Sequence, residues 1–484
     1  MKLNNPELLC SQCLINGEWC DALSGKREAV INPATGAELA SIPLVSEEET
    51  QQAIAAAQRA QNEWKQLTAK QRSALLLAWA DKVLAAQEDL AQLMTAEQGK
   101  SLAEARGEVA YAASFITWFA EEAKRVDGAV LQAPQASQRL VVVKQPIGVC
   151  AAITPWNFPA AMITRKVAPA LAAGCAIIVK PAEQTPLTAL ALAKLAQDAG
   201  IPAGVLQVVT GEAAQVGKVL CDSPVVRKLS FTGSTEVGRI LMAQCAPSIK
   251  KLSLELGGNA PVIVFDDANL DAAVAGIMAS KFRNSGQTCV CANRIYVQDG
   301  IYERLAEKLV AAVEQLKVGD GSQEGTTQGP LIDSDAVAKV QSHIDDALIK
   351  GAQIATGGQP HALGGTFFQP TVVTGVTQKM RFAKEETFGP VAPLFRFHDE
   401  AEAIAMANDT EFGLAAYLFT QNAARQWRVP EALEYGMVGI NTGLISNEVA
   451  PFGGVKQSGL GREGSRYGIE EYLELKYLCI DVSC

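Results

Sequence analysis

The sequence predicts an α/β protein with two doubly wound domains and a small β arm. Short apolar runs alternate with amphipathic stretches from about residue 147, and a similar alternation begins again at residue 261. Strands that alternate with helices indicate parallel sheets with helices on both faces. The length of 484 residues also favours more than one core, because domains usually hold about 100–200 residues.

The N-terminal region is expected to be helical scaffold. Residues 46–125 open with Ser46 and early acids, and their apolar positions recur three and four apart, as in amphipathic helices. Cys10 and Cys13 precede them as a C-x-x-C pair, but no second pair and no nearby histidine complete a metal site. We interpret this pair as incidental, in a mobile tail, and expect no bound metal.

Strands and helices of the two alternating regions follow in order. The first region has strand-like runs VCAAIT, AIIVK, VLQVV, KLSF and KLSLEL, with helical stretches at 160–173, 186–199, 212–221 and 235–245. The second has PVIVF, RIYVQ, TVV, APLFRF, AAYLFT and MVGIN. Residues 129–148 and the C-terminal YLELKYLCIDV read as further strands. Because unpaired strand edges need partners, we expect them to pair between subunits of a homo-oligomer.

Composition excludes several classes of protein. The net charge is −10 with no Lys/Arg cluster, which argues against nucleic-acid binding. The N-terminus does not resemble a signal peptide and the apolar stretches are too short to span a bilayer, so we expect a cytoplasmic protein without membrane contact. Eleven irregularly spaced cysteines suit a reducing compartment, and three histidines make a His-dependent triad a poor fit.

Two segments could hold a dinucleotide. KLSFTGSTEVG places Gly233 and Ser234 between a strand and a helix start, where free backbone N–H groups attract phosphate; an ordinary capped turn is an equal alternative. IIVKPAEQTP places Lys180 and Glu183 beyond a strand end, where an acid can bind ribose hydroxyls. Glu183 could equally be an acid that stabilises a helix start.

Three further residues could carry chemistry. Cys289, in GQTCVCANR, is a potential nucleophile, but a thiol needs a base or a cation to become a thiolate. Glu255 ends an apolar strand and is either solvated there or buried as a general base. Asn157, between two prolines in TPWNFP, could donate to an oxyanion.

Together these segments resemble the aldehyde dehydrogenase superfamily. The motifs are PWNFP, KPAEQTP, FTGSTEVG, LELGGNAP, GQTCVCANR, EETFGP and PFGGVKQSGLGREG, in the family's order and spacing over almost the whole chain. The resemblance implies two Rossmann-like domains: an NAD(P)-binding domain from 1–128 and 149–254, and a catalytic domain at 255–467. It also implies oligomerisation strands at 129–148 and 468–484, in a dimer or tetramer.

The resemblance also implies residue roles. Cys289 would attack the aldehyde, the Asn157 side chain and the Cys289 N–H would hold the oxyanion, and Glu255 would activate the hydrolytic water. The cofactor would be NAD, with NADP as an alternative because Lys180 accompanies the acid. Its binding residues would be Lys180 and Glu183 at the adenine ribose, Trp156, Gly233 and Ser234 near the pyrophosphate, and Glu386 and Phe388 at the nicotinamide.

Within the superfamily the chain most resembles the succinate-semialdehyde dehydrogenases. Arg165, Arg283 and Ser446 match positions that bind the substrate's distal carboxylate, although each arginine could instead be a solvated charge. Glutarate semialdehyde, one methylene longer, is not separated by the sequence. Cys291 is either a packing residue or the partner of Cys289 in a regulatory disulfide. Glu255 disfavours a CoA-acylating enzyme, which needs no deacylating base. A Cys–His hydrolase would need a histidine partner that the chain does not visibly offer. The intact Cys, Glu and Asn set disfavours a non-enzymatic lens-type protein.

Overall fold

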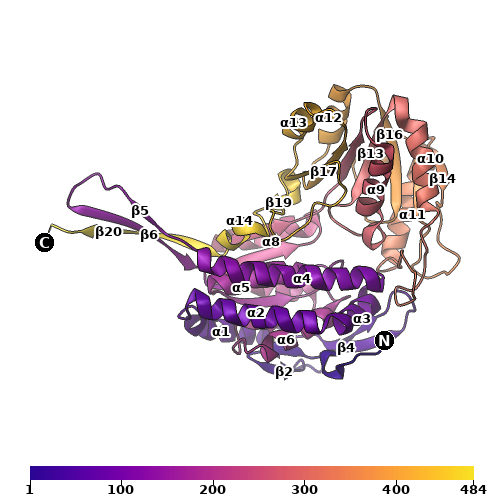
Figure 1. Ribbon diagram of the computed structural model, residues 1–484. Helices are drawn as coiled ribbons and strands as arrows, with labels where there is room; N and C mark the ends of the chain where they lie inside the picture. The colour runs from indigo at the N-terminus through magenta and orange to yellow at the C-terminus, as the bar shows by residue number, and fades with distance from the viewer. Residues whose placement is uncertain (484) are drawn as a thin grey trace.

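The computed structural model describes residues 1–483 and contains four sheets (Figure 1). Two large sheets of eight and seven strands form the body, and sheets of three and two strands accompany them. The predicted α/β class with two parallel sheets is confirmed. Cys484, the last position of the expected C-terminal oligomerisation segment, lies outside the described residues.

The first large sheet has the order β19-β11-β10-β7-β8-β9-β1-β2. Its five central strands run parallel, and β1 and β19 join antiparallel at the two sides. The strands are β1 (Cys13–Ile15), β2 (Glu18–Cys20), β7 (Val149–Ile153), β8 (Ala176–Lys180), β9 (Leu206–Val208), β10 (Val226–Thr232), β11 (Lys251–Glu255) and β19 (Gly459–Leu460). A late segment of the chain thus returns to this sheet.

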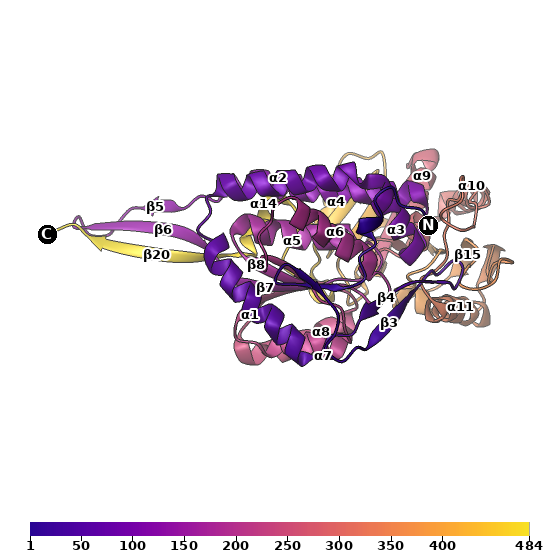
Figure 2. The ribbon, with the colours of Figure 1, turned by 90° about the horizontal axis from the view of Figure 1, so that it is seen from below.

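Helices cover both faces of this sheet, as Figure 2 shows. Along β8, Ile177 and Val179 pack into one core with α5 and α6, whereas Ala176 and Ile178 pack into another with α1, α7 and α8, because side chains alternate along a strand. Helices α2, α3 and α4 form an outer layer over α5 and α6. The helices are α1 (Glu47–Trp64), α2 (Ala69–Ala85), α3 (Gln87–Gln98), α4 (Leu102–Glu122), α5 (Ala161–Ala173), α6 (Pro186–Asp198), α7 (Ala213–Asp222) and α8 (Thr235–Cys245).

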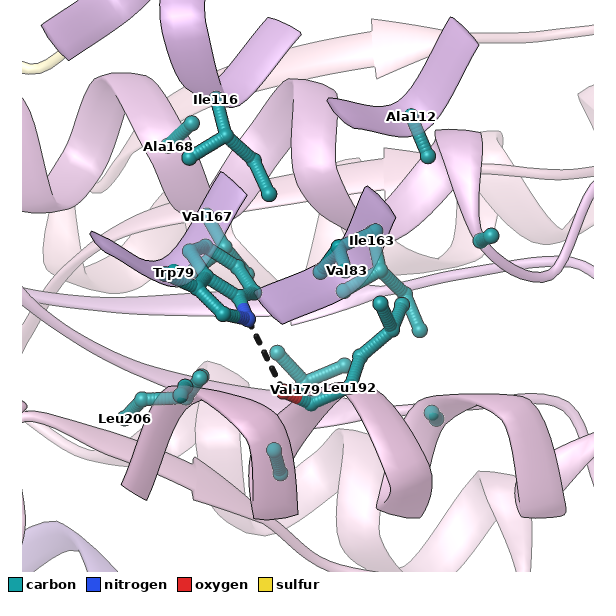
Figure 3. Close-up of a cluster of buried hydrophobic side chains, with 14 of the residues drawn as sticks. Trp79, Val83, Ala112, Ile116, Ile163, Val167, Ala168, Val179, Leu192 and Leu206 are labelled. Carbon is teal, nitrogen blue, oxygen red and sulfur yellow. Dashed lines mark hydrogen bonds between the residues drawn. The ribbon is translucent and has the colours of Figure 1, made fainter. Parts of the chain in front are cut away.

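Trp79 fastens the outer helical layer to the inner one (Figure 3). Its ring is fully buried and its Nε1 donates to the Leu192 carbonyl of α6 at 3.1 Å. Replacing such a residue by alanine destabilises a protein by about 3–5 kcal/mol. Helix α4 of this layer also contacts the turn before Cys289, because its Glu104 accepts from the Asn284 N–H at 2.7 Å.

The second large sheet has the order β14-β15-β16-β13-β12-β17-β18. Helices α9 and α10 pack on one face and α11, α12 and α13 on the other. The strands are β12 (Ala260–Val264), β13 (Ala292–Gln298), β14 (Gln353–Thr356), β15 (Thr371–Val376), β16 (Val391–Phe397), β17 (Ala415–Phe419) and β18 (Met437–Ile440). The helices are α9 (Leu270–Lys281), α10 (Tyr302–Val313), α11 (Ser334–Ile349), α12 (Glu400–Asn408) and α13 (Arg425–Ala432).

A three-stranded arm projects from the body (Figures 1 and 2). It consists of β5 (Ala129–Leu131), β6 (Gln138–Pro146) and β20 (Leu473–Asp481), which follows α14 (Ser465–Glu470). β20 pairs antiparallel with β6 along its whole length. The two expected arm segments therefore pair within one chain, and pairing between subunits stays a prediction.

The N-terminal segment differs from the expectation. Cys13 lies in β1, is fully buried and contacts Thr210, so the interpretation of the C-x-x-C pair as part of a mobile tail was wrong. The hairpin of β3 (Arg27–Ile31) and β4 (Glu38–Pro43) was not predicted from the sequence. No helix among residues 1–483 has the length and apolar character needed to cross a membrane.

Candidate active site

Two cavities meet at Cys289. A larger one of about 290 Å³ is lined by Asn157, Cys289 and residues of both large-sheet regions. A small one of about 20 Å³ is lined by Cys289 together with Arg165, Arg283 and aromatic side chains. The Cys289 thiol is therefore accessible from two sides, which suits a nucleophile placed between a cofactor and a substrate.

The turn before Cys289 has an unusual backbone. Asn284, Ser285 and Gly286 all have positive φ, of 49°, 54° and 77°. Gly286 is required there, because a Cβ at this position would lie 2.1 Å from the Gly389 carbonyl oxygen. Left-handed residues other than glycine store strain that the surrounding structure must support, so Cys289 follows a backbone segment that its neighbours hold in place.

Asn157 lies next to the nucleophile in the larger cavity, as predicted from the sequence. Its Nδ2 donates one hydrogen bond to the Gln287 carbonyl at 3.0 Å. Its main-chain carbonyl oxygen accepts from Lys100 Nζ and Asn284 Nδ2. An amide nitrogen carries two hydrogens. The second hydrogen is available for an oxygen bound beside Cys289.

The environment of Cys289 disfavours the thiolate. Burial raises the pKa of the thiol to about 12, the nearby carboxyl groups of Glu386 and Glu255 raise it further, and the Arg165 guanidinium lowers it. A thiol in this state is almost fully protonated at neutral pH. Reaction therefore needs a group that removes the proton.

Glu255 is buried behind the two cavities rather than solvated at the strand end. Its side chain is 3% exposed, neither carboxyl oxygen has a hydrogen-bond partner within residues 1–483, and burial raises its pKa well above the ordinary value. The residues that line the two cavities in the described part of the chain do not include Glu255.

A second buried carboxyl explains the proton affinity of Glu255. Glu463 forms ion pairs with Lys166 and Arg165, which lower its pKa. The negative charge of Glu463 in turn raises the pKa of Glu255. Of these two acids, Glu463 is the one held ionised, whereas the protonated form of Glu255 is favoured.

The larger cavity contains the residues expected at the nicotinamide end. The rings of Trp156 and Phe388 pack edge to face, with 5.5 Å between their centroids. Glu386 accepts from the Gly258 N–H at 3.2 Å, and burial raises its pKa to about 7. Gly233 and Ser234 line the same cavity, and Ser234 caps α8. The predicted phosphate-binding turn therefore opens into the cavity that holds Cys289.

Lys180 and Glu183 form an ion pair beyond the end of β8. Glu183 lines a further cavity of about 330 Å³, which shares Ile332 and Asp333 with the larger cavity at Cys289. The two spaces thus adjoin. An elongated ligand with an anionic centre and polar ends, such as a dinucleotide, fits this shape, with its phosphates at the N-terminus of α8.

The small cavity holds the three residues predicted to bind a distal carboxylate, Arg165, Arg283 and Ser446. Arg165 pairs with Glu463 and lies 4.0 Å from the Phe452 ring centre, but its Nη2 has no hydrogen-bond partner within residues 1–483. Arg283 lies 4.7 Å from the Phe158 ring centre and forms no ion pair with any described residue. The pocket is therefore cationic.

Cys291 points away from both cavities. Its thiol is fully buried and donates to the Lys281 carbonyl at 3.3 Å, whereas Cys289 is partly exposed. Both cysteines are free thiols. A disulfide between them would require the Cys291 side chain to leave the core, and this role stays a prediction.

Several site residues escaped the sequence analysis. They are Lys166 and Glu463 behind Glu255, Lys100 and Glu108 behind Asn157, Lys339 in the larger cavity, and Glu28 beside Glu183. Charges within apolar runs, such as Lys166 in MITRKVAPAL, were the available signal, because a buried charge is normally paired. Lys339 and Glu28 belong to none of the motifs quoted from the sequence.

Comparison with known proteins agrees with this site. The sequence matches the profile of the aldehyde dehydrogenase family over residues 19–478. The chain belongs to the aldehyde dehydrogenase family. It is 65% identical over 480 residues to the NADP+-dependent succinate-semialdehyde dehydrogenase of Escherichia coli K12, covering 99% of this chain and 100% of the relative.

Two further relatives are equally close. The glutarate-semialdehyde dehydrogenase of Pseudomonas putida KT2440 is 64% identical over 482 residues, covering 100% of both chains. The crystal structure of succinate-semialdehyde dehydrogenase from Burkholderia pseudomallei is 63% identical and covers 100% of both chains with a TM-score of 0.99. The predicted family and the enzymatic nature of this aldehyde dehydrogenase are thereby confirmed.

Proposed function

We propose that this aldehyde dehydrogenase oxidises succinic semialdehyde to succinate with NAD or NADP as the hydride acceptor. Relatives at 63–65% identity that carry this activity in their names support the substrate. The observation that carries the proposal is the unpaired Arg283 guanidinium, which lines the same small cavity as Cys289. A guanidinium is well shaped to bind a carboxylate through two parallel hydrogen bonds.

Cys289 forms the bond to the substrate in this proposal. Its sulfur attacks the aldehyde carbon, and the resulting oxyanion accepts hydrogen bonds from Asn157 Nδ2 and the Cys289 N–H. Burial raises the pKa of the thiol to about 12, so the thiol must first lose its proton. Cys289 is partly exposed in the larger cavity, and water that enters the cavity takes this proton. Trp156, Phe388 and Glu386 hold the nicotinamide end of the cofactor in the larger cavity, which Cys289 also lines. The bound cofactor supplies the acceptor for the hydride that leaves the carbon.

Glu255 serves the second half of the reaction. Loss of the hydride leaves a thioester on Cys289, and water must cleave it to give the carboxylic acid. A carboxyl group with a raised pKa is a stronger base once ionised and suits removal of a proton from water. Glu255 has that property and lies close enough to raise the pKa of the Cys289 thiol.

The test uses the charge of Arg283. Arg283→Met keeps much of the apolar side chain and removes the cation, and a lost charge-assisted hydrogen bond weakens binding by about 1.5–3 kcal/mol. We expect kcat/KM for succinic semialdehyde to fall about tenfold to a hundredfold, with butyraldehyde oxidation unchanged, by cofactor absorbance. An equal fall in kcat/KM for both aldehydes would refute the proposed binding of the substrate carboxylate by Arg283.

Glutarate semialdehyde is the second candidate substrate, because a relative of 64% identity is named for it. One methylene changes binding by only about 1–3 kcal/mol. The small cavity measures about 20 Å³, so its lining side chains must move for either substrate. Comparing kcat/KM for the two semialdehydes in the same assay decides between them.

NAD is the cofactor that the charges favour. Glu183 faces the cavity at the adenosine end, and Glu28 lines it as well. Burial and the nearby Glu183 raise the pKa of Glu28, while Lys180 lowers it. Two acids beside one lysine disfavour an additional 2′-phosphate. NADP remains the alternative, since the Escherichia coli relative is named for it.

We further propose a homo-oligomer that works in the cytoplasm. The arm exposes apolar side chains, with Leu475 70% and Val130 79% exposed, and an apolar sheet face of this kind suits a subunit interface. A reducing compartment keeps Cys289 as the thiol that the reaction needs. Light scattering of the full chain and of a chain ending at residue 470 measures the role of the arm.

A further inference from the structure

Two buried donors converge on the main-chain carbonyl of Asn157. Lys100 Nζ donates to this oxygen at 2.8 Å from the junction of α3 and α4. Asn284 Nδ2 donates to it at 3.0 Å from the nucleophile turn. Both side chains are at most 2% exposed. Hydrogen bonds from two different parts of the chain therefore hold the loop that carries the predicted oxyanion donor.

Lys100 is held by a carboxylate that also caps a helix. Glu108 forms a fully buried ion pair with Lys100, and its Oε1 accepts from the N–H groups of Ala160 and Ala161 at 2.9 and 3.2 Å. These N–H groups lie at the start of α5, directly after the PWNFP loop. The Lys100–Glu108 pair thus fixes both sides of Asn157.

Asn284 connects this loop to the nucleophile. Its Nδ2 also donates to the Gln287 carbonyl at 3.3 Å, and the same carbonyl accepts from Asn157 Nδ2 at 3.0 Å. The backbone N–H of Asn284 donates to Glu104 of α4 at 2.7 Å. One amide therefore links the two catalytic loops, and α4 holds the left-handed residue from which that amide projects.

We propose that Lys100, Glu108 and Asn284 are positioning residues that set the Asn157 amide against the Cys289 turn for attack on the aldehyde. This rests on the oxyanion role of Asn157 in the proposed function. The PWNFP loop follows β7 of the first large sheet, whereas the Cys289 turn follows α9 and precedes β13 of the second, so no secondary structure joins the two loops. Errors of about 1 Å in such an alignment can slow a reaction about a hundredfold.

The first test removes the Asn284 amide. Asn284→Gly preserves the turn, because glycine readily adopts positive φ. Ser285→Gly is the matched control: Ser285 shares the left-handed backbone, but its hydroxyl donates to Gly329, outside both loops. We expect the first-turnover burst of cofactor reduction to slow about tenfold to a hundredfold in Asn284→Gly only. Alkylation of Cys289 by iodoacetamide and the KM for the cofactor should stay near wild type.

The second test removes the buried pair without leaving a lone charge. Lys100→Met with Glu108→Gln neutralises both partners, since breaking only one is strongly destabilising. Glu97→Gln is its control, because Glu97 is also fully buried and accepts from two N–H groups at the start of α6, at 2.7 and 2.8 Å. We expect the melting temperature to fall in both variants. The rate of the first-turnover burst should fall only in the variant that lacks the Lys100–Glu108 pair.

A double-mutant cycle separates positioning from stability. Asn157→Ala alone should slow the burst about 10²- to 10³-fold, and adding Asn284→Gly to it should cause no further loss, because the two act through one amide. Additive losses, or equal bursts in Asn284→Gly and Ser285→Gly, would overturn the positioning role. A normal burst in Asn157→Ala would instead overturn the oxyanion assignment in the proposed function, and the positioning role with it.

Discussion

The two cavities on either side of Cys289 are built differently. The larger one has about 290 Å³ and is lined by residues from β10, the turn before α8, α11 and the PWNFP loop, and it adjoins a further cavity of about 330 Å³. The smaller one has about 20 Å³ and is lined by aromatic rings and two guanidinium groups. The proposed cofactor side is therefore larger and extended, whereas the proposed substrate side is small and cationic.

The larger cavity holds residues proposed to act in the chemical step, and the small cavity holds residues proposed to select the substrate. On the cofactor side, Asn157 and Glu386 have hydrogen-bond partners that fix them. On the proposed substrate side, Arg283 forms no ion pair with any described residue. Arg283 is half-buried beside Cys289, and a guanidinium in such a pocket suits a ligand's carboxylate. Among the described residues, Glu255 lines neither cavity.

The largest expected effect comes from the atom that both cavities share. Cys289→Ala should reduce aldehyde oxidation by on the order of 10⁴-fold or more, because no covalent adduct can form. Cofactor binding, measured by fluorescence quenching, should persist, since the larger cavity keeps its other lining residues. Oxidation that survives this change would refute the assigned nucleophile.

The next effect concerns Glu255 and the pH dependence. Both Glu255 and Cys289 have raised pKa values, so their reactive, deprotonated forms accumulate only as the pH rises, and turnover should increase from about pH 6 to about pH 9. Glu255→Gln should keep a burst of reduced cofactor and slow steady turnover about 10²- to 10⁴-fold. Loss of the burst together with turnover would place Glu255 in the first step instead.

A smaller effect is expected at the far end of the cofactor side. Glu183→Ser removes a carboxylate that repels a 2′-phosphate, and like charges in contact cost several kcal/mol. We expect the ratio of kcat/KM for NADP to that for NAD to rise on the order of tenfold, with Glu212→Ser as a control on a neighbouring exposed acid. An unchanged ratio would show that Glu183 does not select the cofactor.

The smallest effect on basal activity is expected for Cys291→Ala, because this thiol lines neither cavity. If Cys291 forms a disulfide with Cys289, peroxide should inactivate the wild type reversibly, with dithiothreitol restoring activity. The variant should then be inactivated irreversibly, since Cys289 can be oxidised further. Identical recovery in both proteins would assign Cys291 to packing alone.

The sequence was sufficient for the order of elements and for the residues that belong to motifs. Apolar alternation placed β7, β8, β10 and β11 and the helices between them, because parallel strands buried on both faces are continuous apolar runs. Cys289, Asn157 and Phe388 were found through short motifs, and the structure gathers them around one cavity. Local patterns carry this information because turns and caps are encoded within a few residues.

Tertiary structure alone decided which charges are paired and where side chains point. Glu255 could be read as solvated or buried, and only the packing of Gly453 and Glu463 around it shows that it is buried. Cys13 reads as part of a tail but completes a core, and Lys100 meets Asn157 across 57 positions. Burial, pKa and ion pairing depend on neighbours that are distant in the chain, and no local pattern specifies those neighbours.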